Sequence, residues 1–184
     1  MKKPDWTAWV EDKKECLKWN RLYLKKGMLR RGSLKPRNYL KKSLHNLDFA
    51  NWIYDKHKYE IKDFFEGESF FDWVIVIYYY AVYHGALALL ASKNLSSKSH
   101  MATLNALILN FYHENEIERK DVEVVADSIS KSLEKEDIKI VAGSKDLRER
   151  ASYGAGYNFE ESLVKSSKKD VVSFIEKVRS ILEL

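Results

Sequence analysis

The sequence predicts an all-α protein: an up-and-down bundle of four to five helices with an extra helix at its N-terminal side. Only two prolines and seven glycines interrupt the 184 residues, which favours long helices over a fold with many turns. Apolar side chains recur at helical spacing in most of the chain. Short connections separate these periodic segments, and short connections place antiparallel helices next to each other.

The first predicted helix covers residues 5–25, and Asp5 is a suitable N-cap for it. A second helix, from about residue 38 to residue 65, follows Pro36, a residue suited to the first turn of a helix. The Glu-Gly-Glu-Ser sequence of residues 66–69 ends this helix. The apolar positions of the first helix are Trp6, Trp9, Val10, Cys16, Leu17, Trp19 and Tyr23.

An apolar helix is predicted next, from about Phe70 to Lys93. From Trp73 to Ala91, nineteen consecutive residues carry no formal charge, which is long enough to cross a bilayer core. In a membrane, however, three consecutive tyrosines and a histidine would lie near the bilayer centre, whereas tyrosine prefers the interfaces. The mean hydropathy of the chain is −0.45. We therefore predict a buried bundle helix and no membrane span.

Three more helices complete the predicted bundle. A turn at residues 94–99 leads into a short helix over residues 99–113. Another helix covers residues 121–134, and the last runs from about residue 160 to residue 182. The last helix has a clear apolar stripe, formed by Val171, Phe174, Ile175, Val178, Ile181 and Leu182.

The net charge of +5 is unevenly distributed. Residues 25–42 hold eight lysines and arginines and no acidic residue, while the rest of the chain is slightly acidic. The glycines and the proline in this segment indicate an exposed connection. It is either a contact surface for phosphates or a solvated loop. We accordingly divide the chain into residues 1–35, a helix with a basic connection, and residues 36–184, the bundle.

Several classes of function have no support in the sequence. The single cysteine, Cys16, excludes an internal disulfide and fits a reducing compartment. The first residues lack the apolar core of a signal peptide, so we expect a cytoplasmic protein. Glycine-rich phosphate loops and Cys/His metal motifs are absent from the sequence, and we predict neither a metal nor a cofactor.

The apolar helix contains a recognisable motif, YYYAVYHGALALLA, followed after a turn by Ser99 and His100. This pattern resembles the second helix of the HEPN superfamily of small prokaryotic helical bundles, in which paired tyrosines precede Phe/Tyr-His. The resemblance covers about residues 38–182. Its matching positions in the helix are Tyr79, Tyr80, Ala81, Tyr83, His84, Ala86, Ala88, Leu89 and Leu90.

The resemblance implies a bundle that usually forms a homodimer. Many members of the superfamily are metal-independent ribonucleases, often toxins of toxin–antitoxin pairs. Others partner a minimal nucleotidyltransferase or bind nucleotides or RNA. The ribonucleases use an arginine followed, after four to six residues, by a histidine, and two copies face each other across the dimer. Arginine suits phosphate binding, and histidine suits removal of the 2′-hydroxyl proton near neutral pH.

This chain departs from the ribonuclease signature. The segment LRERASYGAGY contains Arg148 and Arg150 but no histidine. In one register, Tyr153 takes the place of the histidine. In the other, Ala155 takes that place, and Tyr157 matches a tyrosine that the nucleotidyltransferase modifies in some relatives. Both registers stay open.

The predicted catalytic residues are Arg148 and Arg150, either of which would hold phosphate, and Tyr153, which would supply a hydroxyl. The predicted RNA- or nucleotide-binding residues are Tyr157, His84, His100, Tyr80, Arg30, Arg31, Lys35 and Arg37.

The polar residues of the apolar helix also have structural interpretations. His84 would be a buried histidine that bonds across the bundle. His100 would be a helix-start residue pointing to solvent, or a residue of a cleft. Tyr79, Tyr80 and Tyr83 would be core aromatics whose hydroxyls reach the edge of the bundle.

Two functional classes stay open. In the first, the protein is a cytoplasmic homodimer that binds RNA or nucleotide and acts as a metal-independent, toxin-type endoribonuclease with a degenerate site. In the second, it is a non-catalytic module that partners a minimal nucleotidyltransferase in a toxin–antitoxin or defence system. The missing histidine favours the second class.

Overall fold

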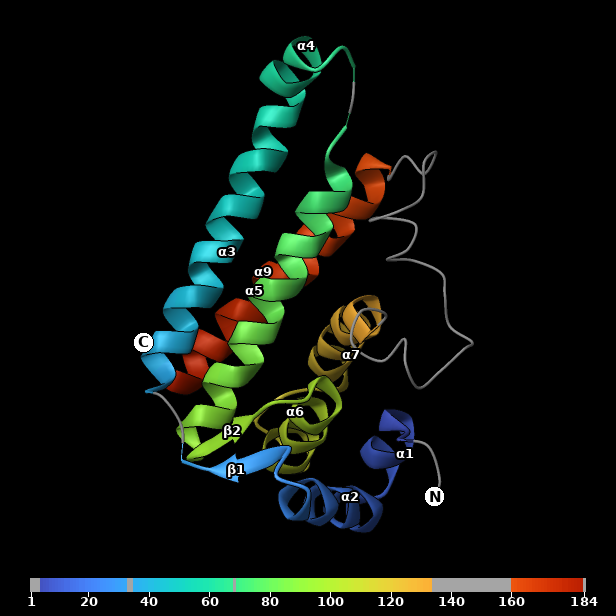
Figure 1. The fold of residues 1–184 in the computed structure, drawn as a ribbon, viewed down its shortest axis with the longest axis vertical. Helices are drawn as coiled ribbons and strands as arrows, with labels where there is room; N and C mark the ends of the chain where they lie inside the picture. The colour runs from blue at the N-terminus through green and yellow to red at the C-terminus, as the bar shows by residue number, and fades with distance from the viewer. Residues whose placement is uncertain (1–3, 33–34, 68, 134–159, 184) are drawn as a thin grey trace.

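The computed structural model of the protein describes residues 4–32, 35–67, 69–133 and 160–183 (Figure 1). In these residues the fold is helical apart from one antiparallel pair of short strands. The elements in chain order are α1 (Trp6–Glu11), α2 (Lys13–Lys25), β1 (Leu29–Arg31), α3 (Pro36–Lys56), the π-helix η1 (His57–Ile61), α4 (Lys62–Phe64), α5 (Phe71–Ser92), β2 (Leu95–Ser97), α6 (His100–Leu107), the π-helix η2 (Ile108–Tyr112), α7 (Arg119–Leu133) and α9 (Glu161–Leu182).

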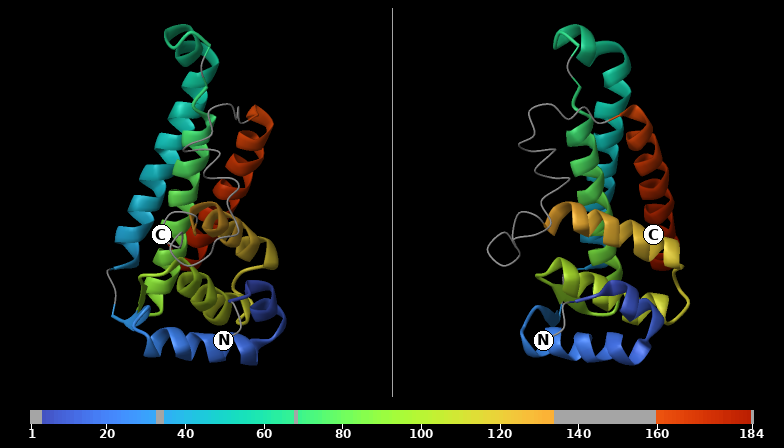
Figure 2. Two further views of the ribbon diagram at one scale, coloured as in Figure 1. Left: turned by 45° about the vertical axis from the view of Figure 1, so that its right-hand side comes forward. Right: turned by 90° about the vertical axis from the view of Figure 1, so that its right-hand side faces the viewer.

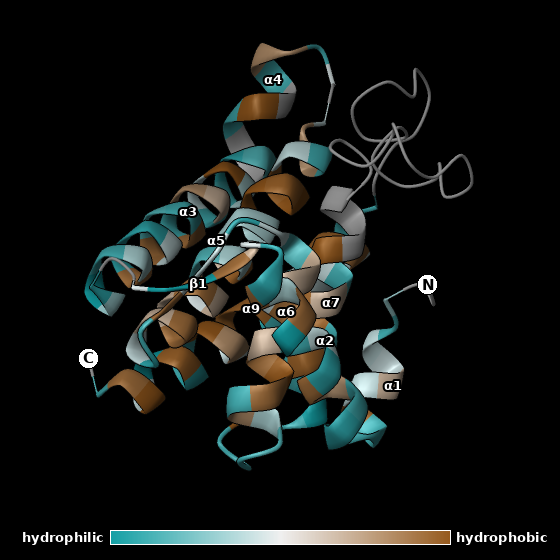
Figure 3. Ribbon diagram, turned by 60° about the horizontal axis from the view of Figure 1, so that its bottom comes forward, coloured by the Kyte–Doolittle hydropathy of each residue, from teal (hydrophilic) through white to brown (hydrophobic). Residues whose placement is uncertain are grey.

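Helix α5 is at the centre of the bundle and packs against α3, α9, α7 and α6. In Figure 1, α3 lies beside α5 and antiparallel to it, while α9 lies behind α5 and runs in the same direction. Helix α7 runs across α5 in the right-hand view of Figure 2. Hydrophobic and hydrophilic bands alternate along α3 and α2 in Figure 3, as amphipathic helices require. The prediction of an all-α helical bundle is confirmed.

The apolar helix is a core helix. Among the described residues, α5 is the one helix whose length and hydropathy would suffice to span a membrane, and 67% of its most apolar window is buried within the fold.

Because residue 85 is a glycine, α3 and α9 can both pack closely against α5 at this position. A Cβ atom at Gly85 would lie 3.2 Å from Cε1 of Phe174 and 3.5 Å from Oγ of Ser43. That Ser43 hydroxyl donates a 2.6 Å hydrogen bond to the carbonyl of Ala81.

The single helix predicted for residues 5–25 is two helices, because the chain bends at Asp12. This residue has extended dihedral angles and ends α1. Its side chain then accepts a 2.7 Å bond from the Lys14 amide and caps α2. Capping aspartates compete with helical continuation in this way. Asp5 caps α1 by accepting from the Thr7 amide at 3.0 Å, as predicted.

The N-terminal helices pack against the bundle, where α1 and α2 contact α6 and η2. Trp9 is fully buried, and its ring lies 5.8 Å from that of Trp19, which in turn lies 5.8 Å from the ring of Tyr23. His113 donates from Nε2 to the carbonyl of Trp9 at 2.8 Å. Tryptophans in this segment therefore stabilise its contact with the same chain's bundle.

The turn predicted at residues 94–99 is wrong in part, because Leu95–Ser97 forms strand β2. It pairs antiparallel with β1, so that Arg30 lies opposite Ser96. The basic connection is correspondingly a strand followed by the first turns of α3. Strands of three residues have too little length to show a period in the sequence. Their pairing fastens the basic segment to the C-terminal end of α5.

The other predicted helices are confirmed to within about a helical turn. The second predicted helix begins at Pro36 as α3 and continues through η1 and α4. It ends where Glu66 and Gly67 adopt positive φ angles of 52° and 91°. The short helix after Ser99 is α6 with η2, and the last two are α7 and α9.

Candidate functional site

The predicted residues Arg148, Arg150, Tyr153 and Tyr157 lie outside the described residues. The remaining predicted residues come from α5, the start of α6, β1 and the start of α3. Five side chains meet where α5 passes the first residue of α6. We call them the histidine–tyrosine cluster: Tyr79, Tyr80, Tyr83, His84 and His100.

Helical spacing assembles the cluster. Tyr79 and Tyr83 are one turn apart on α5, and their rings stack at 6.1 Å with an interplanar angle of 18°. Tyr80 and His84 form the next such pair. The ring of Tyr83 lies 6.1 Å from that of His84 and 4.5 Å from that of His100, so one tyrosine contacts both imidazoles.

His84 is held in one tautomer. Its Nδ1 lies 2.7 Å from the carbonyl oxygen of Tyr80, so Nδ1 carries the hydrogen and donates it. In the neutral ring, Nε2 then has a lone pair that can accept a proton. The side-chain amide of Asn46 in α3 lies 3.5 Å from the same Nδ1. Because Nδ1 and the amide nitrogen are both donors in this tautomer, they are in contact without a hydrogen bond. His84 is half-buried and bonds to its own helix, not across the bundle as predicted.

The protonation of His84 follows from its surroundings. Burial lowers the pKa of His84 below its ordinary value, and the positive charge of Lys42 lowers it further. The hydrogen bond to the Tyr80 carbonyl raises the pKa of His84, but its effect is smaller than that of burial. The imidazole is therefore neutral at neutral pH, which is the state that a general base needs.

His100 begins α6, directly after Ser99, whose side chain caps the helix. Its Nδ1 lies 3.2 Å from the Tyr79 hydroxyl, and the two atoms share a hydrogen bond. The ring is half-buried. His100 is therefore oriented by a buried tyrosine at the start of α6, and it shares the ring of Tyr83 with His84.

The prediction that all three tyrosines are core aromatics is wrong for Tyr80, which is 47% exposed; Tyr79 is buried and Tyr83 half-buried. Tyr80 belongs to an uncovered stripe of α5. Trp73, seven residues earlier, is 58% exposed, and Ile77 lies half-buried between them. This spacing places all three on one helix face. The helix is apolar all round, so the sequence could not distinguish its exposed face.

The predicted basic residues Arg30, Arg31, Lys35 and Arg37 are exposed. Arg30 donates from Nε to the carbonyl of Gly27 at 3.1 Å. These residues come from β1 and from the chain leading into α3. The β1–β2 pairing holds them at the end of the bundle where α5 ends and α6 begins.

These residues belong to a wider acid-free region, of which the sequence prediction covered only part; we call its exposed lysines and arginines the basic surface. Residues 16–47 contain ten lysines and arginines and no acidic residue. Residues 73–113 also contain no acidic residue, over forty-one positions. The fold packs these two segments together through β1–β2 and through α3–α5. The absence of acidic residues from residues 73–113 is the feature of the sequence that could have revealed the rest of this region.

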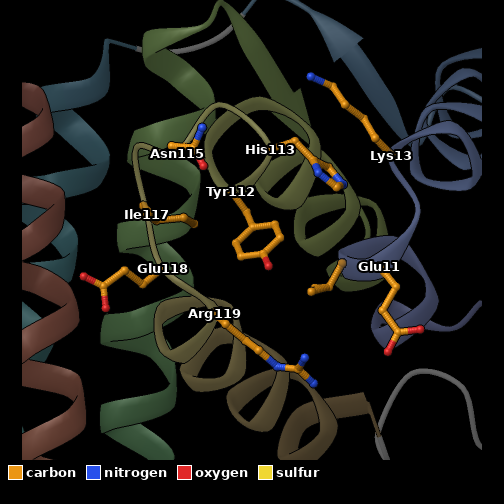
Figure 4. A pocket seen from close by; sticks show the side chains of 9 residues that line it. Glu11, Lys13, Tyr112, His113, Asn115, Ile117, Glu118 and Arg119 are labelled. Atoms are coloured by element: carbon orange, nitrogen blue, oxygen red, sulfur yellow. The ribbon is translucent and has the colours of Figure 1, made fainter.

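A hollow of about 530 Å³ lies elsewhere, between α1 and the connection from η2 to α7 (Figure 4). The Tyr112 ring lies near its centre, with Ile117 to its left and Arg119 below it in this view. Its cations are already paired: Lys13 lies 2.8 Å from Glu114, and Arg119 lies 3.0 Å from Glu123. Its lining residues are Val10, Glu11, Lys13, Tyr112, His113, Asn115, Ile117, Glu118 and Arg119.

An anionic ligand in this hollow would have to compete with those carboxylates, since residues 114–127 hold six acidic and two basic residues. The histidine–tyrosine cluster lies in an acid-free part of the sequence instead. Within the described ranges, no group of His, Cys, Asp and Glu has the arrangement of a metal site. For phosphate chemistry, the cluster is therefore the better candidate.

In a comparison with known families, the model of the HEPN domain matches residues 57–184. The matched residues begin at η1 and include α5, α6 and α9, and with them the whole histidine–tyrosine cluster. Helices α1, α2 and α3 precede the match. A comparison with curated proteins finds none that matches.

Proposed function

The chain belongs to the HEPN domain family, and from this premise we propose that it binds RNA at the histidine–tyrosine cluster and the basic surface beside it. The observation that supports this most is the meeting of the two acid-free segments at a neutral histidine. Lys42 lies one turn before Asn46 on α3, and the Asn46 amide is 3.5 Å from the His84 ring, so a phosphate at that lysine would lie on the side of α3 that faces the imidazole. Clustered cations attract the RNA backbone independently of sequence.

The same geometry supports cleavage without metal. In the proposed step, Nε2 of His84 takes the proton from a 2′-hydroxyl, and the 2′-oxygen attacks the adjacent phosphorus. The bond from phosphorus to the 5′-oxygen breaks, and in our proposal His100 is the acid that donates a proton to that oxygen. The products are a 2′,3′-cyclic phosphate and a 5′-hydroxyl end. Lys42 stabilises the negative charge on the phosphate, and Arg148 or Arg150 stays our prediction for a second cation.

The test is a cleavage assay on a mixed RNA pool with EDTA present. We expect His84→Gln to slow cleavage by at least about 100-fold, the usual contribution of a general base, with RNA affinity within a few-fold of wild type. His45→Gln removes an exposed histidine of α3 and serves as the matched control. Arg148→Ala and Arg150→Ala test the predicted cations.

Equal cleavage by wild type and His84→Gln would refute this role for His84. If the wild type binds RNA in a salt-dependent manner and does not cleave it, the function is binding alone. If it neither binds nor cleaves RNA, the RNA proposal fails.

The exposed stripe of α5 favours a second candidate, a non-catalytic interaction module. Trp73 and Tyr80 are about half exposed on a helix face without charges, and such residues commonly anchor protein interfaces. We propose that this face contacts a second copy of the chain; a nucleotidyltransferase partner is the alternative occupant. Sedimentation of the purified protein separates the two, because only the first gives a dimer without another protein.

A further inference from the structure

Two aromatic rings stand outside the core on α3. The rings of Phe49 and Trp52 are nearly parallel, with an interplanar angle of 14° and a centroid distance of 6.2 Å. Phe49 is 48% exposed and Trp52 57% exposed, although the adjacent Ala50 is fully buried. A stacked pair of this kind keeps an outer ring face in water, and that face can extend the stack with another flat group.

The charged residues on the α3 face that carries Phe49 are lysines. Lys42, Phe49 and Lys56 are seven residues apart, so they lie along one face of α3. Lys42 is exposed, and Lys56 is paired with Glu60. The cores of protein interfaces are depleted of charged residues, whereas charged residues flank this pair. Aromatic rings next to basic residues are instead typical of surfaces that bind single-stranded nucleic acid.

The charges on α3 also indicate which side of the helix the phosphates of a bound strand would follow. Asp48 and Asp55 lie one turn either side of Trp52, and Asp55 is 3.8 Å from Nζ of Lys168. Phosphates would therefore follow the Lys42 side of the stripe. That side leads to Asn46, which lies one turn before Phe49. The side-chain amide of Asn46 contacts His84. A base stacked on Phe49 would consequently lie one turn of α3 away from the side chain that contacts His84.

We propose that Phe49 and Trp52 form a base-stacking platform that selects unpaired RNA for the histidine–tyrosine cluster. This inference rests on the proposed function, because it requires RNA to bind at the cluster. The bases of a duplex are stacked on each other and cannot reach the rings, whereas those of a loop or a single strand can. The phosphate contact at Lys42 does not distinguish the two forms of RNA.

The experiment compares the affinity of the full chain for a single-stranded RNA oligonucleotide and for a duplex of the same sequence. Trp52→Leu and Phe49→Leu keep an apolar side chain but remove the flat ring. We expect each to weaken single-strand binding by about 5- to 100-fold, the range found for the loss of one base–aromatic stack, with duplex binding changed less than about twofold. Phe64→Leu, at an 82% exposed ring of α4, is the matched control.

Lys42→Ala provides the second arm, with weaker binding of both RNAs expected. If Lys42→Ala weakens binding while Trp52→Leu and Phe49→Leu leave single-strand affinity unchanged, the platform is refuted and the proposed function stands. If the wild type binds no RNA, both fail together. If Trp52→Leu instead changes the sedimenting mass with RNA affinity intact, the pair is a protein contact and the inference is overturned.

Discussion

Asn20 donates from its side-chain amide to Oδ1 of Asn105, 3.1 Å away, inside the interface between α2 and α6. Asn105 in turn donates to the carbonyl of Cys16 at 3.1 Å. Asn105 is fully buried, so water cannot replace these bonds. The pair fastens the N-terminal helices to a helix of the matched HEPN region.

We expect Asn105→Ala to lower the free energy of unfolding by about 1–3 kcal/mol, since it leaves the buried Asn20 amide without its acceptor and the Cys16 carbonyl without its side-chain bond. Urea unfolding followed by tryptophan fluorescence measures this. A double-mutant cycle with Asn20→Ala isolates the amide–amide bond. Additive losses in that cycle would contradict a coupled network.

Substitutions at Gly85 should destabilise the fold in order of size. A Cβ atom there would press on the fully buried Phe174 at 3.2 Å, so the ring or the helices would have to shift. For Gly85→Val we expect a loss of about 1–3 kcal/mol from overpacking. Gly85→Ala should cost less, because the gain in helix propensity offsets part of the strain. Thermal melts report both, and a more stable Val variant would disprove the close contact.

Stability should fall in mild acid partly because of His84. Its folded-state pKa is lowered by burial, while in the unfolded chain it is near the ordinary 6.5. As the pH falls below about 6.5, His84 is protonated in the unfolded chain before it is protonated in the folded protein. The free energy of unfolding therefore decreases until the pH reaches the lower pKa of the folded state. His84→Asn should reduce the stability difference between pH 7 and pH 5 measured by urea unfolding. Parallel pH profiles for the two proteins would rule this out.

The thiol of Cys16 should be unreactive in the folded protein. The side chain is fully buried, and burial raises its pKa to about 12, so hardly any thiolate exists at pH 8. Reaction with a chromogenic disulfide reagent should be very slow in buffer and complete in concentrated urea. Fast labelling of the native protein would show that α2 opens away from α6.

Charge on the exposed stripe of α5 should prevent self-association. Tyr80→Glu places a carboxylate at a 47% exposed position of the stripe, where a tight protein interface would have to desolvate it. If the stripe is a homodimer interface, the sedimenting mass should fall from that of a dimer to that of a monomer. Phe64→Glu, on the distant α4, is the control. If the Tyr80→Glu variant still sediments as a dimer, this face of α5 is not the homodimer interface.

Periodicity predicted most helices because a buried helix face repeats its apolar residues along the chain. The limits of each helix depended on local capping, and Pro36 and Asp5 could be recognised for that reason. The bend at Asp12 could not, because the apolar spacing continues across it and an aspartate can either cap a helix or face solvent within one.

The candidate site was predictable in type but not in arrangement. His84 and His100 were recognised from their motif, yet the tautomer of His84 depends on a carbonyl one turn away and its pKa on burial. The exposure of Tyr80 depends on which neighbours cover α5. Neither property is a function of residue identity alone.

The sequence by itself determined that the chain is helical, that α5 is its apolar helix and that a HEPN-type motif lies on it. Those features are encoded in residues close together in the chain. Only the tertiary structure decided that two acid-free segments meet through β1–β2, and that Tyr83 contacts both His84 and His100. These are contacts between distant segments, and they exist only after the core has selected which helices pack together.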